Sequence, residues 1–138
     1  MWHNSVENKN SLEAILSGSI PDLDSILLHE FKIVTGEDIQ IFLKFDIFGK
    51  KIIFPKKWIE KEFNTLQITI LLMAVKVNSF NMEYLKYPNG KIKINELGGL
   101  KIIKFESLKG QCIFEIEAKW IYLNSINGYK NEVYNPSE

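Results

Sequence analysis

The stretch IQIFLKFDI, residues 39–47, decides the fold class of this chain. Every second residue in it is apolar, and the positions between include a lysine and an aspartate. Because successive side chains of a β-strand point to opposite faces, this period of two predicts a strand with one face in a hydrophobic core. The preceding TGED segment, residues 35–38, suits a hairpin turn that leads back to an earlier strand over residues 25–34.

The same alternation recurs towards the carboxyl end. It predicts further strands over residues 66–72, 92–94, 100–105 and 112–122, with Val75 and Val77 continuing the first of these or belonging to a neighbour. Turn sequences separate them, namely PNG at 88–90, GG at 98–99 and KG at 109–110. Short strands with frequent turns predict a mostly β, antiparallel fold, either a sandwich or a curled, barrel-like sheet of about six to eight strands.

One short helix is expected near the amino end. It runs from Ser11, which can cap its start, to Gly18, which can end it. Leu12, Ile15 and Leu16 have the i, i+3 and i+4 spacing of a single apolar stripe. Such a helix is expected to dock on the sheet rather than to stand alone.

The inward side of the strands predicts the hydrophobic core. Cys112 falls on that side of the last strand, so we expect a buried and inert thiol. Glu115 and Glu117 fall on the other side and are expected to face solvent. The residues expected to be largely buried are Ile41, Leu43, Phe45, Ile68, Ile70, Phe114, Ile116 and Trp120.

The length of 138 residues fits one domain over residues 1–138, with the tail after about residue 128 expected to be loose. A single cysteine excludes an intrachain disulfide. The amino terminus lacks the basic and apolar regions of a signal peptide. The longest apolar run, residues 70–75, is far shorter than the roughly 20 residues that cross a bilayer. We therefore expect a cytoplasmic protein that does not bind membranes.

The charges balance overall but not along the chain. All 17 basic residues are lysines and the net charge is zero, which argues against a nucleic-acid-binding protein. Acidic residues are concentrated in the first 48 positions, where they outnumber the lysines. The acidic residues that would suit a basic partner are Asp22, Asp24, Glu30, Glu37 and Asp38.

Residue types that carry catalysis are few. His3 and His29 are too few for a three-histidine zinc site, and the chain has no phosphate-binding glycine motif. His29 stands next to Glu30 in a predicted strand, so the two side chains are expected on opposite faces. A pair formed by Cys112 and His29 lacks the local sequence that activates a thiol. We expect no catalytic, cofactor-binding or metal-binding residues and no enzymatic activity. Two alternatives stay open, namely a small hydrolase or nuclease that uses His29, and a structural or ligand-binding β module.

Residues 49–58 interrupt the strand pattern. Pro55 cannot sit in a central strand, so this segment is expected to be a connection or an irregular edge. Its lysines bracket apolar residues in a way that single-strand nucleic-acid binders also do, although a charged loop is the favoured interpretation. Trp58 is expected to cover one end of the sheet, with an exposed anchor for a partner as the alternative.

Four segments resemble immunity protein family 50. They are PKKW (55–58), FNTLQI (63–68), PDLDSILLHE (21–30) and LKFD (43–46), and the likeness covers roughly residues 1–125. The resemblance implies a largely β protein that is encoded beside a polymorphic toxin and neutralises that toxin by binding. It implies no catalytic residues and no cofactor. Trp58 and Asn64 match the motif, and whether they contact the toxin or hold the fold stays open.

The expected function is therefore that of an immunity protein with a cognate toxin domain as its partner. The oligomeric state is not predicted. The candidate partner-binding residues are Trp58, Asn64, Asp22, Asp24, Glu37 and Asp38.

Overall fold

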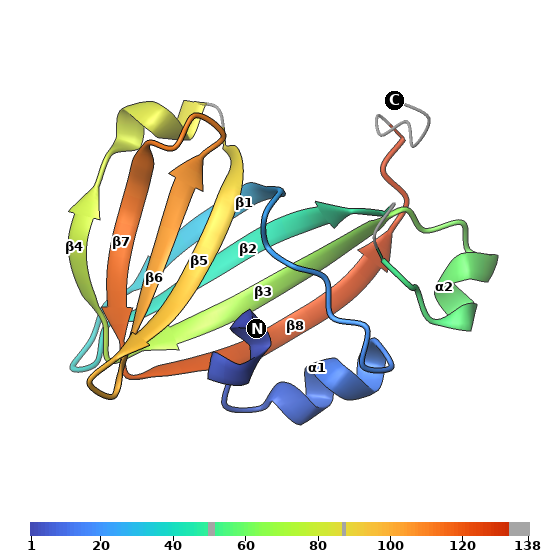
Figure 1. The fold of residues 1–138 in the computed structure, drawn as a ribbon, viewed down its shortest axis with the longest axis horizontal. Coiled ribbons are helices and arrows are strands. Elements are labelled where there is room, and N and C mark those ends of the chain that lie inside the picture. Colours follow the sequence, from blue (N-terminus) through green and yellow to red (C-terminus); the bar gives the residue numbers. More distant parts are fainter. Residues whose placement is uncertain (50–51, 87, 133–138) are drawn as a thin grey trace.

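A computed structural model describes residues 1–49, 52–86 and 88–132. Its strands form one eight-stranded sheet in the order β4-β7-β6-β5-β1-β2-β3-β8, with antiparallel neighbours and open edges (Figure 1). The predicted mostly β, antiparallel fold is confirmed. The strands are β1 (Ile26–Val34), β2 (Gln40–Phe48), β3 (Thr65–Met73), β4 (Lys76–Phe80), β5 (Asn89–Leu97), β6 (Leu100–Ser107), β7 (Cys112–Ala118) and β8 (Trp120–Tyr129).

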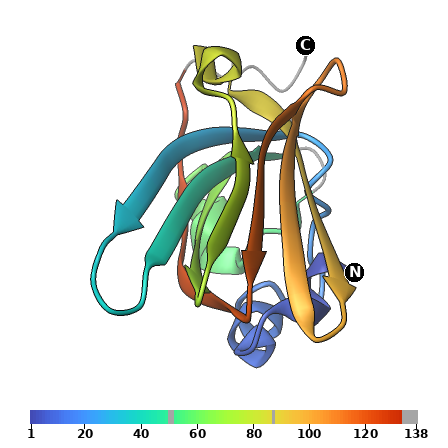
Figure 2. The ribbon, with the colours of Figure 1, turned by 90° about the vertical axis from the view of Figure 1, so that its left-hand side faces the viewer.

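The sheet folds over itself where β1 meets β5. These strands pair only at Ile26 with Gly90 and at Leu27 with Asn89, and then they diverge. Gly90 is required at this corner because a Cβ atom there would collide with the backbone carbonyl of Glu106. Beyond the corner, β5, β6, β7 and β4 cover one face of β1, β2, β3 and β8, and the β1–β2 hairpin projects past β4 (Figures 1 and 2).

The core fills the space between these two halves of the sheet. Phe114 of β7 packs there, with ring centroids 5.5 Å from Phe105 and 5.2 Å from Phe31. Seven of the eight residues predicted to be buried have no exposed surface, which confirms the inward side of β2, β3 and β7. They are Ile41, Leu43, Phe45, Ile68, Ile70, Phe114 and Ile116.

Trp120 is the exception, and its prediction as a core residue is wrong. Its side chain is 43% exposed, whereas the next residue, Ile121, is fully buried. The predicted strand over residues 112–122 is in fact two strands, because the chain turns a corner at Lys119. There the Lys119 amide donates to the carbonyl of Met73. After this corner, buried and exposed side chains alternate at the start of β8 in the opposite phase to those of β7. The corner turns Trp120 outward.

Cys112 was expected to be buried, and it is exposed. The register of β6 and β7 shifts by one residue, so that Phe105 pairs with Phe114 but Glu106 pairs with Cys112. The bulge buries both Ile113 and Phe114 and leaves Cys112 on the outside. Glu115 and Glu117 accept hydrogen bonds from Asn78 at 2.9 and 3.1 Å on the outer side of β7.

The amino-terminal segment protects an edge of the sheet. It consists of a 3-10 turn, η1 (Trp2–Ser5), and a short helix, α1 (Lys9–Ile15), which confirms the predicted short helix. The bounds differ, because Ser11 lies inside the helix rather than at its start and the helix ends before Gly18. The side chain of Asn8 bonds both backbone groups of Leu123, at 2.7 and 3.0 Å. Glu7 adds a backbone bond to Ile121. These bonds cover part of the free edge of β8, which would otherwise invite pairing with another chain.

Two further short elements are α2 (Lys56–Glu60) and η3 (Met82–Lys86). The expected connection at 49–58 therefore contains the start of a helix, and its residues 50–51 lie outside the described part. Of the expected loose tail, residue 129 belongs to β8, whereas residues 133–138 are not described. No helix in the described ranges is long and apolar enough to cross a membrane.

Candidate functional site

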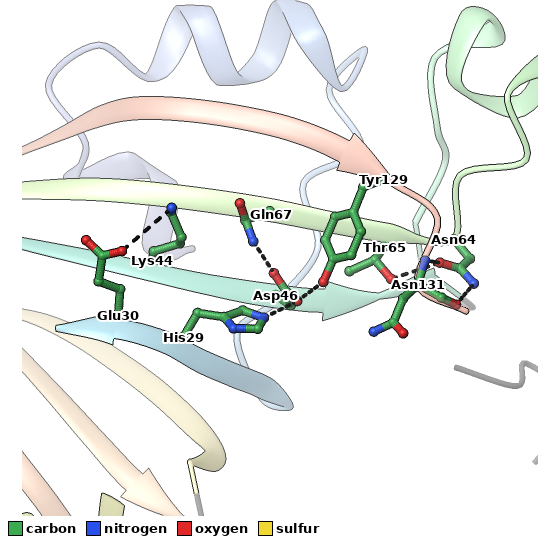
Figure 3. Close-up of polar contacts among 9 residues, drawn as sticks. All are labelled: His29, Glu30, Lys44, Asp46, Asn64, Thr65, Gln67, Tyr129 and Asn131. Atoms are coloured by element: carbon green, nitrogen blue, oxygen red, sulfur yellow. Dashed lines mark hydrogen bonds and ion pairs between the residues drawn. The ribbon is translucent and has the colours of Figure 1, made fainter. Parts of the chain in front are cut away.

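A β-bulge at His29 shapes the outer face of β1 and β2. Leu28 pairs with Phe45 and Glu30 pairs with Lys44, so His29 is the extra residue. The bulge turns His29 and Glu30 to the same side, which makes the expectation of opposite faces wrong. Glu30 lies 3.7 Å from Lys44, and His29 contacts the next outward residue of β2 (Figure 3).

That next residue, Asp46, faces outward and yet has no exposed surface. Three donors from three different strands converge on its carboxylate (Figure 3). Nε2 of His29 donates to Oδ2 at 2.5 Å, and the hydroxyl of Tyr129 donates to the same oxygen. Nε2 of Gln67 donates to Oδ1 at 3.0 Å. A buried carboxylate needs such donors, and here they join β1, β3 and β8 to β2.

The environment of Tyr129 disfavours loss of its proton. Burial raises the pKa of Tyr129 to about 12, and the hydrogen bond to the negative Asp46 carboxylate acts in the same direction. A phenolate at this position would lie in a desolvated site against a second negative charge. Tyr129 therefore serves as a hydrogen-bond donor at neutral pH.

Asn64 fastens the end of β8 to the start of β3. Its Oδ1 accepts from the Asn131 amide at 2.7 Å and from the Thr65 hydroxyl at 2.9 Å. Its Nδ2 donates to the Asn131 carbonyl at 2.9 Å (Figure 3). All these contacts are within the chain, so the structure places this motif residue in a fold contact.

Trp58 lies half-buried on α2, where it packs against the core. Its ring centroid is 6.3 Å from that of Phe54 and 6.2 Å from that of Phe63. A Cβ atom added to Gly128 of β8 would lie 2.8 Å from the Trp58 ring and 2.7 Å from the Phe63 ring. Gly128 thus allows the two rings to cover the end of the sheet, as the lid interpretation of Trp58 expects.

The four candidate acidic residues do not form one patch. Asp22 and Asp24 precede β1, and the Asp24 amide donates to the Asp22 carboxylate at 3.2 Å. Glu37 and Asp38 lie in the turn after β1. A nine-residue strand separates the two pairs, which corresponds to about 30 Å. Among the described residues, neither Glu37 nor Asp38 has a lysine or histidine within ion-pair distance.

An aromatic cluster on the outer face of β1, β2, β3 and β8 is the main feature that sequence reasoning missed. Strand pairing aligns Val34, Gln40, Met73 and Trp120 in one row, and Lys32, Phe42, Leu71 and Tyr122 in the next. Phe42, at an outward position of the strand predicted over residues 39–47, was the available signal. We call the apolar members of both rows the aromatic half of the outer face, namely Val34, Phe42, Leu71, Met73, Trp120 and Tyr122. The outward residues outside these two rows form its polar half, which includes His29, Glu30, Lys44, Asp46, Gln67, Thr69 and Tyr129.

The other candidates for chemistry stay apart from this face. Cys112 lies on β7, in the other half of the sheet from His29. Nε2 of His3 lies 3.6 Å from a carboxylate oxygen of Glu13 on α1. Within the described ranges, no three His, Cys, Asp or Glu side chains are grouped so that they could hold a metal ion.

Comparison with known proteins gives one match. Searches of curated proteins and of solved structures found no match to this chain. The model of the family described as Immunity protein 50 matches residues 8–129, which is most of the chain. The matched region begins at Asn8, which covers the edge of β8, and ends at Tyr129, which bonds Asp46. The chain belongs to the Immunity protein 50 family.

Proposed function

We propose that this protein protects its own cell by binding a cognate toxin domain and blocking it without catalysis. The observation that carries the proposal is the family match over residues 8–129. The expected partner is a protein, rather than nucleic acid or a membrane, and the expected location is the cytoplasm. Binding alone suffices for this function, because an inhibitor that occludes an active site needs no chemistry of its own.

The architecture supports this proposal. A rigid sheet with a buried core can present a fixed surface, which keeps the entropic cost of association low. Trp120 and Tyr122 of the aromatic half are of the residue types that dominate binding energy in protein interfaces. Glu37 and Asp38 are exposed at the tip of the projecting hairpin and would speed the approach of a basic region of the partner.

One observation favours a second candidate, a small hydrolase or nuclease. His29 contacts a carboxylate from the neighbouring strand at 2.5 Å, and its side chain is 41% exposed. A histidine oriented by an aspartate is a familiar general base. However, Asp46 is simultaneously held by Gln67 and Tyr129, an arrangement that suits a fixed structural link among strands.

The test is co-expression of this chain with the toxin domain that family membership leads us to expect in a neighbouring gene. We expect the domain to kill cells when expressed alone, to be harmless with this chain, and to form a complex that survives size-exclusion chromatography. The His29→Ala variant should still protect if binding is the function. Equal killing with and without this chain, and no complex, would rule out the immunity function. Protection that requires His29, in a variant with an intact fold, would favour the enzyme.

A further inference from the structure

The aromatic half of the outer face is apolar but does not belong to the hydrophobic core of this chain. Two of its side chains are exposed and the other four are half-buried. Trp120 is 43% exposed and Val34 is 36% exposed. A cluster of Trp, Tyr, Phe and Met on one sheet face is the composition of an interface centre rather than of an ordinary surface.

Two lysines give this cluster a charge that the chain itself does not balance. Nζ of Lys32 lies 5.3 Å from the centroid of the Phe42 ring, and Nζ of Lys119 lies 5.9 Å from that of Trp120. In the described ranges, neither ammonium group has a carboxylate within ion-pair distance. Other described lysines also lack such a carboxylate, and what distinguishes Lys32 and Lys119 is that each lies over an aromatic ring of this face.

The size of the cluster fits the centre of an interface. Four strands about 4.8 Å apart and two outward positions per strand cover roughly 250 Å². A stable complex buries about 800 Å² on each partner, so the cluster would be the centre and its surroundings the rim. The hairpin turn with Glu37 and Asp38 adjoins the Val34 row and would belong to that rim.

We infer that the aromatic half of the outer face is the docking surface for the toxin domain. The partner would present apolar side chains to Trp120, Tyr122 and Phe42. It would place carboxylates opposite Lys32 and Lys119, because these ammonium groups contact aromatic rings but pair with no carboxylate of the described residues. This inference rests on the proposed function, and it assigns a surface different from the one around Trp58 and Asn64.

The first experiment measures the dissociation constant for the neighbouring gene's toxin domain with Trp120→Ala and Val34→Lys. Each variant should weaken binding by about 30-fold or more, as truncation or disruption of a central anchor does. Val34 lies at the end of β1 next to the turn, so its substitution tests the surface even where Trp120→Ala fails to fold. The matched control is Ile59→Ala on α2, an equally apolar residue that is 60% exposed, and it should bind like the wild type.

The second experiment reverses charge. Lys32→Glu with Lys119→Glu should slow association about tenfold at low salt, whereas Lys56→Glu with Lys57→Glu on α2 should not. Binding by Trp120→Ala and Val34→Lys within threefold of the wild type, while the wild-type complex forms, would overturn the assigned surface and leave the proposed function intact. If the wild type itself forms no complex, the proposed function fails.

Discussion

The polar half and the aromatic half of the outer face lie on the same four strands, β1, β2, β3 and β8. Charged side chains are usually exposed and large apolar ones buried, and here the two halves show the reverse. In the polar half, the charged Asp46 has no exposed surface, and in the aromatic half, Trp120 is 43% exposed. Three hydrogen-bond donors allow the carboxylate to be buried, whereas no described element covers the tryptophan. The difference indicates that the polar half holds the strands together and that the aromatic half is available to a partner.

The largest expected effect compares the two faces of β2 with one residue type. Phe45 is fully buried on the inner face, and Phe42 is half-buried on the outer face. Phe45→Ala should lower the free energy of unfolding by about 3–5 kcal/mol because it leaves a cavity in the core. Phe42→Ala should cost about 1 kcal/mol or less. Denaturant titration of both variants checks this, and equal losses would break the distinction between the faces.

Asp46→Ala tests whether the polar half holds the strands. The substitution leaves His29, Gln67 and Tyr129 without their shared acceptor, so we expect a loss of roughly 2–4 kcal/mol. The matched control on the same face is Lys44→Ala, whose ion pair with Glu30 is largely exposed and is worth about 0–1 kcal/mol. Thermal unfolding compares the stability of the two variants. If Asp46→Ala were as stable as the wild type, the hydrogen bonds around Asp46 would not stabilise the fold.

Gly128→Ala addresses the lid formed by Trp58 and Phe63. The new Cβ atom would lie 2.8 Å from one ring and 2.7 Å from the other, so the lid must move. We expect a loss of about 1–3 kcal/mol and a red shift of tryptophan fluorescence as Trp58 gains solvent. An unchanged spectrum together with wild-type stability would contradict the packing described for Gly128.

The smallest expected effect is a pH dependence from Tyr129. Its pKa in the folded chain, about 12, lies above the ordinary value of 10.0, so the folded state retains the proton more strongly. The stability that this group contributes is complete below pH 10 and is lost as the pH rises towards 12. The wild type should therefore lose stability over this window more steeply than Tyr129→Phe. If stability fell equally with pH in the two proteins, the pKa of Tyr129 would not be raised in the folded chain.

The sequence predicted the architecture where the alternation of apolar residues was uninterrupted. Residues 39–47 and 66–72 became β2 and β3, with the expected side in the core. The errors occur where one residue breaks the alternation. The bulge at His29, the register shift between Cys112 and Phe114 and the corner at Lys119 each reverse which side chains face inward. Such breaks depend on pairing with distant strands, and the local sequence does not encode them.

The same limit applies to the candidate site. The motif drew attention to Trp58 and Asn64, and the structure places both in contacts that hold the end of the sheet. The aromatic half became visible only through strand register, because its members come from four separate strands. The acidic candidates Asp22, Asp24, Glu37 and Asp38 are exposed, but the length of β1 separates them into two pairs.

The most direct test of the account is the dissociation constant of the toxin domain for Trp120→Ala and Asp46→Asn, each measured on folded protein. Trp120→Ala should keep the wild-type melting temperature and bind at least about 30-fold more weakly. Asp46→Asn should melt at a lower temperature and, where folded, bind like the wild type. The reverse result, with tight binding by Trp120→Ala and weak binding by folded Asp46→Asn, would contradict the assignment of structure to one half and recognition to the other.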